Sequence, residues 1–94
     1  MRNATLTAVS VGTSATLLAG PSKHRRVLCF SPNLATGYTV APSDAVAASK
    51  GLAVTASGGL VTLRFEEIGT LVCQAWYGIA ASGIDAAVLE GFEV

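Results

Sequence analysis

The sequence has little charge, few aromatic residues and few side chains that carry catalytic chemistry. Of its 94 residues, 13% are charged and 6% are aromatic, and it has one histidine and two cysteines. An ordinary soluble domain is about 25% charged, so the surface of this small domain must be unusually neutral or apolar. Apolar surface of that kind usually marks contact with another chain or with a membrane.

The apolar runs do not favour a membrane span. A spanning helix needs about 20 consecutive apolar residues, but the charge-free stretches Asn3 to Ser22 and Ile68 to Ile84 are broken by Thr, Ser, Gly or Gln. The first 20 residues resemble a secretion signal only faintly, because Thr and Ser interrupt their apolar positions. We therefore expect a protein partner and no membrane.

The sequence lacks the combinations of side chains that enzyme catalysis needs. Nucleophilic catalysis needs a base beside the nucleophile, and the one histidine, His24, stands inside a basic run. The adjacent carboxylates Glu66 and Glu67 would point to opposite faces of a strand. No cluster of residues has metal-ligand spacing, and Cys29 and Cys73 are interpreted as two buried thiols rather than a disulfide. We expect no enzyme activity, no metal and no cofactor.

Eight short runs separated by Gly, Pro or Asn predict an all-β domain, a pattern typical of a sandwich or small barrel. Only Ser43 to Lys50, with its alanines, favours a helical turn. We predict a single jelly-roll-like β-sandwich over residues 1–94, in which residues 1–8 form an N-terminal arm or an edge strand. The expected strands are Ala4–Val11, Ser14–Ala19, Arg25–Ser31, Gly37–Ala41, Leu52–Ala56, Leu60–Glu67, Leu71–Ile79 and Ile84–Glu90.

Side-chain alternation along these strands predicts their faces. Val61, Leu63 and Phe65 share a core face. In the last two strands, the sides that carry Gln74 and Asp85 would face outward. An outward position would expose an apolar patch around Trp76, a favoured type of interface anchor. Alternatively, both strands are central and covered on both faces, and the pattern does not decide. The patch would comprise Val72, Trp76, Ala87 and Leu89.

The basic run in PSKHRRV (residues 21–27) has three interpretations. Nucleic-acid binding is disfavoured because the net charge is zero and aromatic residues are scarce. Catalysis is disfavoured because the run offers only one histidine, and alternation sends Arg25 and Arg26 to opposite faces, so they would not hold one ligand together. The remaining interpretation is a charged strand start at the rim of a protein contact, where an arginine clasps a carboxylate. The interface candidates are Arg2, Lys23, Arg25, Arg26, Val72, Trp76 and Leu89.

Several short motifs resemble those of small β-rich structural proteins of tailed bacteriophages. They are RRVLCFSPN from Arg25, Gly51-Leu52 with Ser57-Gly58-Gly59 before LVTL, and the closing LVCQAWYGIAASGIDAAVLEG. The resemblance covers about Val9 to Gly91. The sequence departs from the pattern at His24, at Trp76 and in the Ala-rich Ser43 to Lys50.

The resemblance implies a β-sandwich in the virion and no catalytic residue. Several such proteins are capsid decoration (cement) proteins, often trimers at three-fold positions over the major capsid protein. We therefore expect a homo-oligomer, with a trimer favoured, that is assembled in the host cytoplasm and binds the outer capsid between major capsid protein subunits. The alternatives are a receptor- or glycan-binding module of a head or tail fibre, with Trp76, Tyr77 or Tyr38 in a concave site, and a nucleic-acid-binding accessory protein.

Overall fold

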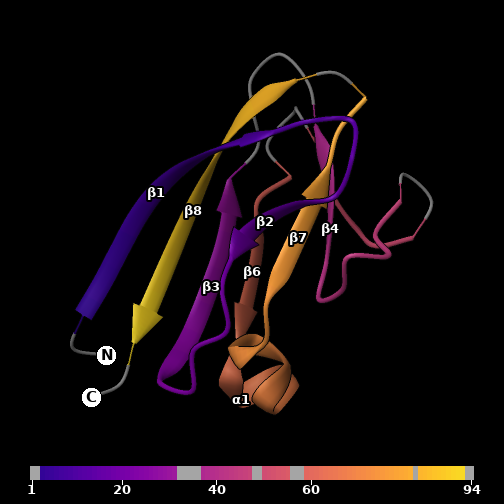
Figure 1. The fold of residues 1–94 in the computed structure, drawn as a ribbon. Coiled ribbons are helices and arrows are strands. Elements are labelled where there is room, and N and C mark those ends of the chain that lie inside the picture. The colour runs from indigo at the N-terminus through magenta and orange to yellow at the C-terminus, as the bar shows by residue number, and fades with distance from the viewer. Residues whose placement is uncertain (1–2, 32–36, 48–49, 56–58, 82, 93–94) are drawn as a thin grey trace.

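Eight strands form two antiparallel sheets of four, as the computed structural model of residues 3–31, 37–47, 50–55, 59–81 and 83–92 shows (Figure 1). Sheet A has the order β1-β8-β3-β6, and sheet B has the order β2-β7-β4-β5. The strands are β1 (Asn3–Val11), β2 (Thr16–Ala19), β3 (Arg25–Ser31), β4 (Tyr38–Ala41), β5 (Leu52–Val54), β6 (Val61–Arg64), β7 (Trp76–Ile79) and β8 (Ile84–Phe92).

The pairing of the strands is that of a jelly roll. β4 pairs with β5, β3 with β6, β2 with β7 and β1 with β8, as in one long hairpin. The hairpin folds over itself, so that β3 also pairs with β8 and β4 with β7. Eight strands wrapped in this way into two sheets define the jelly-roll architecture. The predicted all-β, jelly-roll-like sandwich is confirmed.

The core lies between the sheets and is built by the period-two alternation of the strands. Phe30 of sheet A and Trp76 of sheet B meet there, with ring centroids 5.9 Å apart and planes tilted by 48°. The predicted parity of β6 and β8 is confirmed, because Leu63, Ala86 and Val88 are buried. The other fully or largely buried apolar residues include Val11, Leu18, Leu28, Tyr38, Val40, Val54 and Val72.

Residues 65–73 are helical, and the strands predicted there were wrong. The short helix α1 (Phe65–Ile68) follows β6 directly, and the 3-10 helix η1 (Gly69–Cys73) precedes β7. Gly69 ends α1 and begins η1 at a φ of 64°, a positive value that glycine adopts without strain. These two turns close one end of the sandwich (Figure 1), and so only four residues of LVTLRFEE remain in the strand.

The Ala-rich segment from Ser43 forms turns, and the helical turn predicted there was wrong for the residues that the structure describes. The Val46 amide donates to the Ser43 carbonyl at 3.3 Å, and Ala47 forms an isolated antiparallel bridge with Lys50. Val46 is buried and anchors the segment against the domain. Alanine has the highest helix propensity, but propensity is a weak preference that tertiary context routinely overrides.

Candidate interaction surface

The outer side of sheet A presents a broad uncharged surface. On β8, the side chains of Asp85, Ala87 and Leu89 point away from the core, and Leu89 is 41% exposed. The register with β1 places Leu6 opposite Leu89, and Leu6 is 72% exposed. We call this surface the neutral face and define it by Ala4, Leu6, Ala8, Val27, Cys29, Thr62, Ala87 and Leu89.

A row of paired residues crosses the neutral face from edge to edge. Leu6 pairs with Leu89, Leu89 with Cys29, and Cys29 with Thr62, so the row runs over all four strands. The Thr62 hydroxyl donates to the Cys29 sulfur at 3.6 Å. No member of the row is charged. Two of them are exposed leucines, the side chains that gain most from being covered.

Among the residues that the structure describes, charged groups stand only at the borders of the neutral face. At one end Asp85 accepts a hydrogen bond of 3.0 Å from the Ser10 hydroxyl. At the opposite corner Arg64, the register partner of Val27, is exposed. A neutral centre with a charged or polar rim is the usual anatomy of a protein interface.

The outer side of sheet B is uncharged as well. Tyr77 and Ile79 of β7 alternate with the buried Trp76 and therefore point outward, and both are half-buried. Their register partners on this side are Leu17, Thr39 and Ala41. In the described strands, the outer side of sheet B therefore carries no charged residue, and the outer side of sheet A carries charge only at Asp85 and Arg64.

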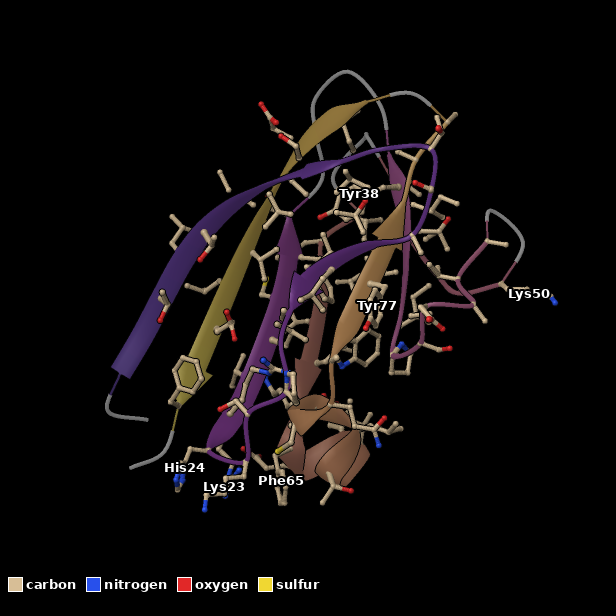
Figure 2. All side chains as sticks on the ribbon, viewed as in Figure 1. Lys23, His24, Tyr38, Lys50, Phe65 and Tyr77 are labelled. Carbon is tan, nitrogen blue, oxygen red and sulfur yellow. The ribbon has the colours of Figure 1, made fainter. Side chains whose placement is uncertain are left out.

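The charges of the basic run lie instead at the end of the sandwich that α1 closes. Figure 2 shows Lys23 and His24 at this end, near Phe65, with their side chains directed away from the sheets. Glu66 and Glu67 of α1 are exposed there too. The basic run therefore shares this end of the sandwich with two exposed carboxylates.

Arg25 is completely buried and acts inside the domain, contrary to its prediction as an interface residue. Its Nε donates to the Val72 carbonyl at 2.7 Å, and its Nη1 donates to the Gly20 carbonyl at 2.7 Å and to the Glu90 carboxylate at 2.8 Å. Its Nη2 donates to the Gln74 carbonyl. The predicted carboxylate clasp exists, but the carboxylate belongs to β8 of the same chain.

Arg26 lies where the pairing of β3 with β8 shifts in register, between Arg25 and Val27, and like Arg25 it contacts the segment around η1, so simple alternation does not separate the two arginines as predicted. Its guanidinium carbon lies 4.5 Å from the centroid of the Phe65 ring, a cation–π contact. Its Nη1 donates to the carbonyls of Lys23 and Arg25, both at 3.0 Å, and to the Cys73 sulfur at 3.8 Å. Arg26 is thus held against its own domain, while Lys23 remains exposed.

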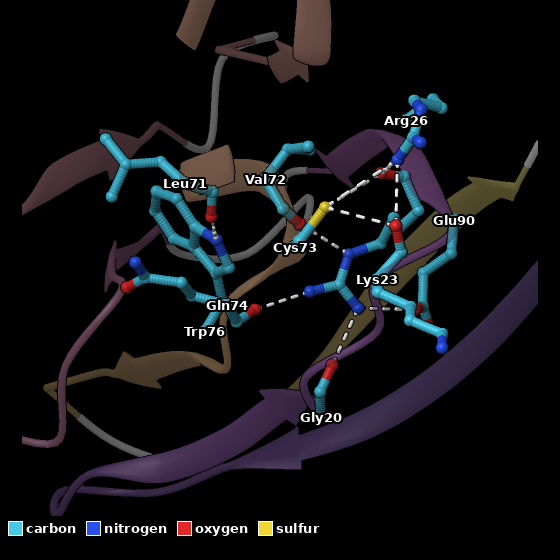
Figure 3. Close-up of polar contacts among 10 residues, drawn as sticks. Gly20, Lys23, Arg26, Leu71, Val72, Cys73, Gln74, Trp76 and Glu90 are labelled. Atoms are coloured by element: carbon cyan, nitrogen blue, oxygen red, sulfur yellow. Dashed lines mark hydrogen bonds and ion pairs between the residues drawn. The ribbon is translucent and has the colours of Figure 1, made fainter. Parts of the chain in front are cut away.

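Val72 and Trp76 are core residues, so the exposed patch expected around them was wrong. They are 0% and 3% exposed. The Trp76 Nε1 donates to the Leu71 carbonyl at 3.0 Å (Figure 3). The expectation failed because it assumed one continuous strand over residues 71–79, whereas η1 breaks the alternation before β7 begins. Leu89 is exposed as expected, and Arg2 lies outside the described residues.

Leu6 is the main residue of the neutral face that the sequence analysis did not single out. The charge-free stretch from Asn3 carried the signal, but only the register with Leu89 shows that two leucines meet on the outside. Glu90 was missed as the partner of Arg25, although the alternation that places Ala86 and Val88 inward also places Glu90 on the core side of β8.

Among the described residues, we looked for a metal site, a disulfide and a glycan-binding site. These residues hold no group of three or more His, Cys, Asp or Glu side chains that would suit a metal ion. Cys29 and Cys73 are free and half-buried rather than buried. Of the aromatic residues considered for a glycan site, Trp76 and Tyr38 are buried and Tyr77 is half-buried. A cavity of about 660 Å³ is lined mainly by small and apolar residues such as Thr13, Ala53 and Ala81.

Searches of protein-family models, curated proteins and solved structures find no match to this chain. Within the part of the chain that the structure describes, no helix is long and apolar enough to cross a membrane.

Proposed function

We propose that this protein is a structural component of a tailed-phage virion that decorates the outer surface of the capsid. It would bind between subunits of the major capsid protein and hold neighbouring capsomers together. The neutral face is the observation that carries this proposal. Two exposed leucines in register, within a face of small uncharged side chains, form a surface that gains free energy when another protein covers it.

The fold and the sequence motifs support the same proposal. Among the described residues, the core between the sheets is a separate cluster that includes neither Leu6 nor Leu89. The motifs that resemble phage structural proteins supply the virion as the setting and the major capsid protein as the partner. Assembly would then take place in the host cytoplasm.

Binding to expanded capsids that lack decoration tests the proposal. The purified protein is expected to cosediment with such capsids and to raise the temperature at which they disrupt. Leu89→Lys places a charge in the centre of the neutral face and is expected to weaken binding at least tenfold, because the charge loses its hydration in the contact. Leu71→Lys changes an equally exposed leucine on η1 and serves as the matched control.

Salt dependence separates this proposal from nucleic-acid binding. A neutral contact is expected to change in affinity by less than about threefold between about 0.05 and 0.5 M NaCl, whereas phosphate contacts weaken by orders of magnitude. Failure to bind any expanded capsid, or equal binding by Leu89→Lys and the unmodified protein, would contradict the capsid proposal.

A further inference from the structure

The free edge of β1 is the longest unprotected strand edge in the described structure. β1 pairs with β8 over all nine of its residues without a register shift, and it stands at the end of the order of sheet A (Figure 1). Residues 4–8 are exposed on both sides of the strand. The edge contains no charge and no proline, which are the features that usually prevent edge strands from pairing with another chain.

The other three sheet edges carry such protection. β6 has four residues, ends at the exposed Arg64 and continues into α1. β2 also has four residues, and its pairing with β7 shifts in register between Leu17 and Ala19. β5 has only three residues and follows the exposed Lys50. The molecule therefore protects three edges and leaves β1 open, as expected for an edge that is paired in the functional state.

The sequence of β1 indicates which strand pairs with it. Residues 4–8 read Ala-Thr-Leu-Thr-Ala, which is the same in both directions about Leu6. In an antiparallel pair of two such strands, residue i faces residue 12 − i. Leu6 then meets Leu6 of the second copy, Thr5 meets Thr7, and Ala4 meets Ala8. Every pair joins identical side chains, with no like charges opposed, and threonine pairs are favourable across strands.

We propose that two copies of this protein associate through β1, antiparallel and related by a two-fold axis at Leu6. The two A sheets then form one continuous eight-stranded sheet. The row on the neutral face then continues across the two-fold axis. Leu89 and Leu6 of one copy are followed by Leu6 and Leu89 of the second copy. A two-fold contact must be self-complementary, which the symmetric sequence of residues 4–8 satisfies. The family resemblance favours a trimer, but a closed three-fold ring requires β1 to pair with a different surface.

Cysteine cross-linking tests both the contact and its register, in a background with Cys29→Ser and Cys73→Ser. Opposed residues of antiparallel strands lie about 4.5–5.5 Å apart between Cα atoms, within the range for a disulfide. Leu6→Cys is therefore expected to form a covalent dimer with diamide as oxidant. Ala4→Cys alone is expected not to, because the two Ala4 positions are separated by about 13 Å along the strands. Ala4→Cys combined with Ala8→Cys restores the cross-link.

Mass measurement in solution provides a second test that needs no oxidant. Sedimentation equilibrium is expected to give twice the chain mass for the unmodified protein. Leu6→Lys opposes two ammonium groups at the axis and is expected to raise the dissociation constant at least tenfold. Leu71→Lys, which places the same charge on an exposed leucine of η1 away from β1, is expected to leave it unchanged. Circular dichroism verifies that each variant is folded.

A monomeric or trimeric unmodified protein would overturn the proposal. So would a dimer that Leu6→Lys leaves intact, or a cross-link of Ala4→Cys alone as efficient as that of Leu6→Cys. Dimerisation does not depend on the capsid proposal, because it is measured without capsids. Capsid binding can therefore fail while the β1 contact holds, and the reverse outcome is equally distinguishable.

Discussion

Arg25 shows at the residue scale how this nearly uncharged chain uses one of its few charges inside the fold. Its planar guanidinium joins the end of β2, the segment around η1 and the last strand through four hydrogen bonds. The Glu90 carboxylate balances its charge, and the backbone carbonyls satisfy its remaining donors. A lysine has one nitrogen and cannot reproduce this fork.

Replacement of Arg25 is expected to destabilise the domain strongly. Arg25→Met leaves the Glu90 carboxylate without its partner, and breaking a buried ion pair in this way costs about 3–5 kcal/mol. A small domain has only about 5–15 kcal/mol in total. Urea denaturation measures the loss of unfolding free energy. The unfolding free energy of Arg25→Lys is expected to lie between that of Arg25→Met and that of the unmodified protein. A loss below about 1 kcal/mol for Arg25→Met would show that these hydrogen bonds contribute little.

Tyr38 gives the fold a pH dependence in the alkaline range. Burial raises the pKa of Tyr38 to about 12, and negative charge on Cys29 adds to the effect. Its hydroxyl donates to the Ser31 carbonyl at 2.7 Å, so the neutral form is held in place. The unfolded chain loses the proton near pH 10, and the folded protein keeps it.

The stabilisation that Tyr38 provides is therefore complete below about pH 10 and falls as the pH rises toward 12. Tyr38→Phe cannot ionise, so its unfolding free energy is expected to decline less over this interval. Denaturation of both proteins at several pH values measures the difference. Parallel curves for the two proteins from about pH 9 to 12 would contradict this assignment.

At the scale of elements, the segment from β6 to β7 is where the local sequence pattern predicts strands and the structure has helical turns. The strands β3 and β8 lie where the sequence predicts them, and β8 runs two residues further than predicted. The segment after Arg64 has the same strand-like composition, yet it forms α1 and η1. The carbonyls of Val72 and Gln74, which a longer strand would use for its ladder, instead accept hydrogen bonds from Arg25.

Trp76 anchors β7 to sheet A, and its removal is expected to test that role. Trp76→Ala deletes the ring that packs on Phe30, and losses of about 3–5 kcal/mol are typical of such changes. Leu89→Ala serves as the control. The sequence analysis placed Trp76 and Leu89 on one exposed patch, whereas in the structure Trp76 is buried and Leu89 is exposed. It is expected to cost less than about 1 kcal/mol. Equal effects in urea denaturation, followed by circular dichroism, would contradict the separation.

At the scale of the whole molecule, the distribution of charge determines which surfaces another protein can cover. In the described strands, the outer side of sheet B carries no charged residue and that of sheet A carries charge only at Asp85 and Arg64, while the exposed charges of the basic run and of α1 gather at one end. A molecule built in this way can be covered on its sides while its charged end stays in water. The proposed capsid contact uses the neutral face, and the proposed pairing of two copies uses the adjoining edge of β1.

The sequence by itself determined the all-β class, the approximate place of all eight strands and the parity of β6 and β8. These properties depend on turn residues and on alternation, which act over a few neighbours in the chain. Only the tertiary structure decided that Arg25 and Trp76 are buried, that Glu90 pairs with Arg25 and that Leu6 meets Leu89. Those outcomes depend on residues up to 83 positions apart in the chain, brought together by sheet pairing that no local pattern records.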